Sequence, residues 1–422
     1  MRLLLSLAFG VIALATPAAA VGDIVLYRLP GTKSVFKLQG KATTNPGRTV
    51  TFRHPLGTLH LALDDVKIFE QKSTRGVFNR KLQKAVRVKD VKACIDAARW
   101  ALHAGMLKEF YSAASEAWKI DRENPTVKRL VAMKQKIDAP LASPEPQERK
   151  LREFTRDLRD MKFTRSRHFV LIHDTPDEKQ GRGRKSRAEQ RLELLETVYQ
   201  SFLMKFCLEG VELDVPKEHL MVVLFSEQAD YLRFVNLIGP QLKSTSGFYH
   251  RIENISVFFD QGTDDTFKVL YEMNRELQAA KAKAIKARAA GTRDLVRFAD
   301  TLHLLTQLSH KNSDIEVVSH EATHHMAGNT GLMPPTSPIP VWAAEGLATY
   351  FESPKEAAWS GIGAVNTQRL NWYRELEPNK RFSNIDFIVS DNIFTLSASH
   401  EATLHGWRRR NADSAEKGNR RL

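Results

Sequence analysis

The chain has 422 residues, of which 42% are hydrophobic and 27% charged. This length allows two or three domains, and this composition excludes a chain that is disordered throughout. The net charge of +14 indicates either solvated basic loops or attraction to an anionic surface such as a cell-wall polymer. No nucleic-acid-binding motif accompanies this charge in the sequence, so we expect no nucleic-acid partner.

Residues 1–20 have the three-part form of a secretory signal peptide. Arg2 gives the positive start, residues 3–15 are apolar, and residues 17–20 are small. The apolar run is shorter than the roughly 20 residues that cross a bilayer. We therefore expect a secreted or periplasmic protein with no integral membrane segment after signal removal. In such a compartment Cys94 and Cys207 could form a disulfide or remain two buried thiols.

The next two regions differ in their hydrophobic period. Residues 21–72 predict a small β module, because apolar runs at 24–27, 35–38, 49–52 and 59–63 are separated by Pro and Gly turns. Residues 77–138 have the helical period, shown by Val91, Ile95 and Ala98. Asn124 followed by Pro125 predicts the start of a further helix. The region resembles one tetratricopeptide-like unit, and we interpret it as a helical spacer or a partner-binding element.

Residues 139–164 are rich in Pro at their start and predict a linker. Beyond them we expect one domain at 165–405, with strands at 169–172, 220–225 and 255–259. Helices are predicted at 188–206 and 264–311, with a break at Gly291. This mixture of strands and helices predicts an α+β fold. Residues 406–422 are polar and basic without periodicity, which predicts a disordered or truncated tail.

The motif His-Glu-x-x-His lies at residues 320–324. On a helix, residues four apart are separated by about 40° around the axis. His320 and His324 can therefore face one metal ion from adjacent turns, and Glu321 lies beside them as a general base for an attacking water. A catalytic zinc site needs three protein ligands and one open position, so a third ligand is required.

The third ligand is suggested by a second motif, 21 residues after His324. Residues 341–352 contain Glu-Gly-Leu-Ala followed by Tyr-Phe-Glu, with Glu345 as the first glutamate. This segment resembles the third-ligand helix of gluzincin metallopeptidases. The resemblance implies that His320, His324 and Glu345 hold one Zn²⁺ per chain and that Glu321 is the catalytic base. It also implies a gluzincin-like domain, with a mixed sheet beside the two active-site helices.

The resemblance can be narrowed to an uncharacterised bacterial group. The signal peptide, the β module, the helical hairpin with Trp100-Ala101-Leu102 and the late gluzincin-like domain together resemble the domain of unknown function 1570 family. The similarity covers about residues 165–405. It implies peptidase-like chemistry without naming a substrate.

Residues 399–405 nearly repeat the motif, but with the spacing His-Glu-x-x-x-His. His400 and His405 are five apart, which is about 140° off axis, so both cannot face one ion from a regular helix. Tyr350, Tyr249 and His250, together with these two histidines, are candidate oxyanion donors. Tyr249 and His250 precede the strand at 255–259, which we expect to form the active-site edge where a peptide could add as a strand.

Thr349 stands one turn after Glu345, where some gluzincins have a carboxylate that orients a ligand histidine, so the outer shell of the site has no candidate. The sequence predicts an exported zinc metallopeptidase acting on peptides or proteins. The alternative is a non-catalytic extracytoplasmic binding protein with a vestigial metal site.

Overall fold

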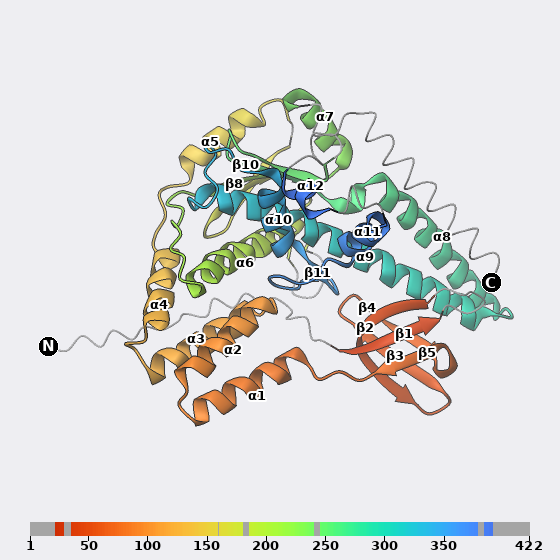
Figure 1. Cartoon of the computed structure of the whole chain (residues 1–422). Coiled ribbons are helices and arrows are strands. Elements are labelled where there is room, and N and C mark those ends of the chain that lie inside the picture. Colours follow the sequence, from red (N-terminus) through yellow and green to blue (C-terminus); the bar gives the residue numbers. More distant parts are fainter. Residues whose placement is uncertain are drawn as a thin grey trace.

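The computed structural model describes residues 22–28, 35–158, 160–179, 185–239, 245–378 and 384–390 (Figure 1). Within these ranges the fold is a mixed α+β fold, which confirms the predicted class at this level. The predicted signal peptide at 1–20, the predicted tail at 406–422 and the pair His400 and His405 lie outside the described residues. No helix in the described ranges is both long enough and apolar enough to cross a membrane.

The first sheet forms a small β module. Its strands are β1 (Asp23–Arg28), β2 (Val35–Asn45), β3 (Thr49–His54), β4 (Gly57–Ala62) and β5 (Val66–Phe69), in the spatial order β4-β3-β2-β1-β5, with the short 3-10 helix η1 (Leu63–Asp65) before β5.

Strand β2 is longer than the predicted piece at 35–38, because it serves two partners. Its first half pairs with β1 and its second half pairs with β3. Gly40 stands near this change of partner, where a Cβ would lie 2.7 Å from the Phe52 ring and 2.5 Å from the Arg53 carbonyl oxygen. A side chain at residue 40 would therefore push β3 away from β2. Leu304, which lies far along the chain, completes the core of this module.

Four helices follow the β module: α1 (Thr74–Arg87), α2 (Val91–His103), α3 (Leu107–Ile120) and α4 (Pro125–Asp138). Asn124 caps α4, since its side chain accepts hydrogen bonds from the backbone N–H groups of Thr126 and Val127, as predicted. The buried faces of these helices share one hydrophobic cluster with the later helices of the chain. The helices are thus a layer packed on the main body, and the predicted domain boundaries stay a prediction.

The segment 139–164, predicted as a linker, is only partly a connection. It contains α5 (Glu145–Phe154), and it runs into β6 (Lys162–Arg165), which pairs with the second sheet. The side chain of Leu151 in α5 is fully buried against that sheet. The sequence did not predict this helix because the segment starts with several prolines, and the helix begins directly after Pro144.

The second sheet positions the candidate site. Its order is β6-β7-β8-β10-β9, with β7 (Phe169–His173), β8 (Leu220–Phe225) and β10 (Ile255–Phe259) parallel, and β9 (Gly247–His250) antiparallel at the edge. Alternate residues of these strands face opposite sides of the sheet. Val223 packs in the cluster that contains Leu151 of α5, and Val222 packs in the cluster that contains the buried residues of α6. Both faces are covered, so the parallel strands are continuous apolar runs, which is why they were predicted correctly.

Helices cover both faces of this sheet. One face packs against α5 and α7 (Gln228–Ile238), and the other packs against α6 (Arg187–Leu208) and α9 (Thr292–Asn329). The short 3-10 helix η3 (Gln261–Thr263) and α8 (Asp265–Ala287) precede α9. Gly291 has φ 74° and separates α8 from α9, which confirms the predicted break.

Helix α9 is a single helix of 38 residues, about 57 Å long, that contains the whole His-Glu-x-x-His motif. It runs beside α8, and Figure 1 shows the β module beneath one end of it. Leu304 in the β-module core and His320 lie on the same helix, about 24 Å apart along its axis. One rigid element therefore joins the β module to the motif.

The remaining elements follow the second motif: α10 (Val341–Glu352), the hairpin β11 (Pro354–Lys355) and β12 (Ala358–Trp359), α11 (Thr367–Leu376) and α12 (Ile385–Val389). Helix α10 has the bounds that were predicted for the Glu345 segment. Cys94 in α2 and Cys207 in α6 are both free and buried, so the structure holds two thiols and not a disulfide.

Candidate metal centre

The predicted ligands come together between α9 and α10. The ligand atoms of His320, His324 and Glu345 all lie within 4.8 Å of one another. Nε2 of His320 is 3.2 Å from Nε2 of His324 and 3.1 Å from Oε2 of Glu345, and Nε2 of His324 is 3.4 Å from Oε1 of Glu345. Two imidazoles and one carboxylate form a donor set that catalytic zinc uses. The three side chains are 12%, 17% and 45% exposed, which leaves the centre accessible from the Glu345 side.

The geometry of α10 is set by packing at both of its ends. At its start, the guanidinium of Arg251 donates to the carbonyl oxygens of Pro334, Pro335 and Ser337, which fixes the loop that leads into the helix. At its end, the backbone carbonyl oxygen of the last residue of α10 lies 3.2 Å from the Ser319 hydroxyl, which also donates within α9 to the Ile315 carbonyl at 2.5 Å. These contacts hold the helix against the motif.

Glu321 lies beside the ligands and contacts the edge of the sheet. Burial raises the pKa of its carboxyl, and the neighbouring imidazoles of His320 and His324 oppose this rise. The carboxyl also has a hydrogen bond with the backbone of Tyr249 in β9. A Cβ at Gly247 would lie 2.9 Å from the Val317 side chain, so β9 approaches α9 closely here. The absence of a side chain at residue 247 lets the edge strand reach the motif.

The edge strand differs from the one expected. The sequence predicted the edge at 255–259, but β9 lies outside β10, so Tyr249 and His250 are themselves on the edge strand. The four residues of β9 are partly polar and have no clear strand pattern in the sequence. They form a strand because they pair with β10.

The described oxyanion candidates point elsewhere. The Tyr249 ring stacks on His325, and its hydroxyl donates to Asn254 at 2.8 Å. His250 faces the opposite side of the sheet, with its ring against Phe154. Tyr350 is five residues after the third ligand, about 140° around α10. His400 and His405 are outside the described residues.

His325, the third histidine of the motif region, belongs to the core. It is fully buried, and burial lowers its pKa to about 3. Its Nδ1 is 2.9 Å from the Ser256 hydroxyl in β10. A neutral imidazole that joins α9 to the sheet explains these contacts, and it leaves His320 and His324 as the ligand pair.

Sequence reasoning missed Glu352, which contacts the ligand His320 from the side opposite the centre. Its Oε2 is 2.6 Å from Nδ1 of His320, and its side chain is fully buried. A metal-binding histidine almost always donates its other N–H to such a group, which fixes the ring and its tautomer. Glu352 follows Glu345 by seven residues, about 20° off the same face of α10. The carboxylate that orients a ligand histidine was expected at position 349. It is instead Glu352, one turn later in α10.

The electrostatics of this centre favour a cation. Burial lowers the pKa of His320, but hydrogen bonds with Glu345 and Glu352 outweigh burial and raise it to about 10. Burial raises the pKa of Glu352, but His320 and Arg369 lower it to about 2. The pKa of Glu345 is also well below its ordinary value, because two imidazoles outweigh its burial. The carboxylates thus stay ionised and stabilise positive charge between them.

A second group of potential ligands lies elsewhere but is already neutralised. Asp260, His310 and Asp314 also have ligand atoms within 4.8 Å. Arg187 pairs with Asp260 at 2.7 Å, and Arg191 pairs with Asp314. Two guanidiniums against two carboxylates leave no excess negative charge to attract a metal. We interpret this group as a buried ion-pair network.

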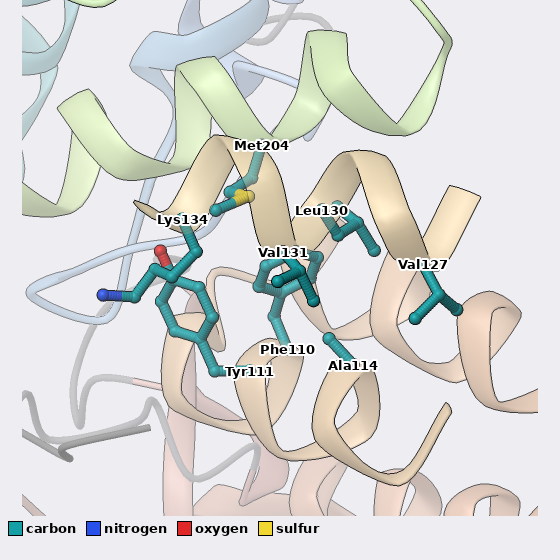
Figure 2. A pocket seen from close by; sticks show the side chains of 8 residues that line it. All are labelled: Phe110, Tyr111, Ala114, Val127, Leu130, Val131, Lys134 and Met204. Atoms are coloured by element: carbon teal, nitrogen blue, oxygen red, sulfur yellow. The ribbon is translucent and has the colours of Figure 1, made fainter. Parts of the chain in front are cut away.

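A small apolar cavity between α3, α4 and α6 is not a ligand site. Figure 2 shows side chains of α3 and α4, among them Phe110 and Leu130, closing around it, with Met204 of α6 above. Its volume is about 10 Å³, which is at most the space of one water molecule.

Comparison with known protein families gives one match, and the residues of the centre lie within it. Residues 314–408 match the family described as "Protein of unknown function (DUF1570)", which supports the resemblance for that part of the chain. The match includes His320, Glu321, His324, Glu345 and Glu352, but it begins well after residue 165, where the expected similarity started. Searches of curated proteins and of solved structures found no match.

Proposed function

We propose that this chain is a gluzincin-type zinc metallopeptidase that hydrolyses peptide bonds. The observation that carries the proposal is the convergence of His320, His324 and Glu345 beside Glu321. The two imidazoles would bind zinc through Nε2, and Glu345 would bind it through its carboxylate. Zinc, when bound, supplies a Lewis acid that polarises a carbonyl and acidifies water. Action outside the cytoplasm rests on the predicted signal peptide.

The chain's own groups account for positioning and proton transfer. An extended peptide would add to the outer edge of β9 by backbone hydrogen bonds. Its scissile carbonyl would then lie near Glu321, which touches the β9 backbone at Tyr249. Glu321 would accept a proton from the attacking water and deliver it to the leaving amine. Burial raises the pKa of this carboxyl, which suits a group that must first take up and then release a proton.

The test combines metal analysis with cleavage of a peptide library by the wild type and by Glu321→Gln. We expect about one zinc per chain in both and cleavage only by the wild type. The matched control is Glu276→Gln on the exposed face of α8, which should cleave like the wild type.

Two outcomes would overturn the proposal. A folded wild type that takes up no zinc would remove the metal centre. Zinc in both proteins without cleavage by either would instead favour the alternative, a binding protein with a vestigial site.

A further inference from the structure

The buried carboxylate of Glu352 receives hydrogen bonds from two directions. On the side of the centre, Nδ1 of His320 lies 2.6 Å from Oε2. On the side of α11, Arg369 contacts both carboxylate oxygens, with Nη2 2.7 Å from Oε2, and Asn366 Nδ2 is 2.7 Å from Oε1. Glu352 thus joins α11 to a metal ligand.

Arg369 on the α11 side is the cation in direct contact with this carboxylate, because a metal ion at the centre would act on it only across the His320 ring. A histidine that binds a metal through Nε2 is neutral, so in that state it gives Glu352 a hydrogen bond and no charge. A fully buried carboxylate without a compensating charge is strongly unfavourable. Arg369 provides that charge with a planar two-point contact that lysine cannot reproduce.

The start of α11 is itself built on this contact. The Asn366 side-chain oxygen accepts from the backbone N–H of Arg369 at 3.2 Å, so it caps the helix. The same amide group donates to Glu352 and, at 3.0 Å, to Glu316 of α9. The first turn of α11 therefore packs on Glu352 of α10 and on Glu316, which lies one turn before the ligand His320 on α9.

We propose that Arg369 is a positioning residue of the metal centre: through Glu352 it holds His320 with Nε2 toward the metal, so that metal binding and docking of α11 stabilise each other. This inference rests on the proposed zinc site. Coupling between two sites is reciprocal, so each direction can be measured separately.

The first measurement is zinc affinity by competition with a chelator in full-length protein. Loss of an outer partner of a metal ligand commonly weakens binding 10- to 100-fold, so Arg369→Gln should weaken it about 10-fold. The zinc affinity of Arg369→Lys should lie between the affinities of Arg369→Gln and the wild type. Arg374→Gln, on an exposed position of the same helix, is the matched control and should bind like the wild type. Arg369 is 40% exposed, so its replacement leaves no cavity in the core.

The second measurement compares the wild type with Arg369→Gln by hydrogen exchange. Backbone amides of residues 367–376 in the wild type should exchange with solvent several-fold more slowly when zinc is added, and the same zinc-dependent protection should be absent in Arg369→Gln. Equal zinc affinities for Arg369→Gln and Arg374→Gln, or no zinc-dependent protection of α11 in the wild type, would overturn the inference while the zinc site stands. A wild type that binds no zinc would remove the site and the inference together.

Discussion

Gly105 and Gly361 pack backbone against backbone and join the turn between α2 and α3 to the segment just after β12. A Cβ at Gly361 would lie 2.2 Å from the Gly105 nitrogen and 2.4 Å from the His103 carbonyl oxygen. His103 Nδ1 is also 3.1 Å from the Ile362 carbonyl oxygen. The helical layer thus directly contacts the segment that follows the ligand helix α10.

Gly361→Ala should therefore be severely destabilising. Its φ is 93°, and the new methyl group meets backbone atoms that cannot rotate away. We expect a loss of about 3 kcal/mol or more in the free energy of unfolding, measured with denaturant. Gly47→Ala is the control, because φ is 80° there but no atom lies within 4 Å of the added Cβ, so only about 1 kcal/mol should be lost. Equal losses in the two variants would contradict the close approach.

The hairpin between β11 and β12 stores strain that a glycine should relieve. Glu356 and Ala357 form its turn with φ of 50° and 59°, a conformation in which Asn-Gly is preferred. Asn312 of α9 accepts from the Ala357 N–H at 3.0 Å, and His54 of the β module lies 3.4 Å from Glu356. Ala357→Gly should raise the free energy of unfolding by about 1 kcal/mol. Ala358→Gly, one residue on in β12, should lower it, and a stabilisation of equal size in both would rule out turn strain as the cause.

The sequence predicted most of the site because its local signals agree with the tertiary structure. The His320–His324 spacing needs only a helix. The strands at 220–225 and 255–259 are apolar apart from Ser256, because both of their faces are buried. Glu345 was found through resemblance, and its helix has the predicted bounds.

What was missed depends on packing between distant segments. The i to i+7 spacing places Glu352 on the Glu345 face, but its partner His320 is known only once α9 and α10 are packed. Edge strand β9 is defined by β10, and the close approach of Gly247 to α9 brings Tyr249 to Glu321. Local periodicity carries no information about such contacts.

Removal of the metal should lower the free energy of unfolding, and it should do so only in proteins that keep the ligand residues. A metal that binds only the folded state adds about 2.7 kcal/mol when its concentration is 100 times the dissociation constant. Zinc should therefore raise the unfolding temperature of the wild type, and a chelator should reverse the rise. Glu345→Gln and His324→Gln should abolish most of the effect. His325→Gln tests specificity: it loses stability through a core contact with Ser256, yet it should keep a zinc-dependent rise.

The buried network around His310 predicts a pH dependence that is separate from the metal centre. Burial lowers the pKa of His310, but hydrogen bonds from its ring to Asp260 and Asp314 outweigh this and raise it. Lys311, Arg187 and Arg191 also border the network, and Tyr271 contacts His310 Nδ1 at 2.6 Å.

A raised histidine pKa gives stability that is fully present below the unfolded value near 6.5 and is lost as the pH rises through the folded value. The free energy of unfolding of the wild type should therefore exceed that of His310→Gln most at pH 6, and the difference should shrink toward pH 9. Denaturant titrations of both proteins at a series of pH values measure this difference, and the contributions of all other titrating groups cancel because the two chains share them. A difference that is constant, or that grows with pH, would show that His310 is neutral in the network and that Arg187 and Arg191 alone balance the two aspartates.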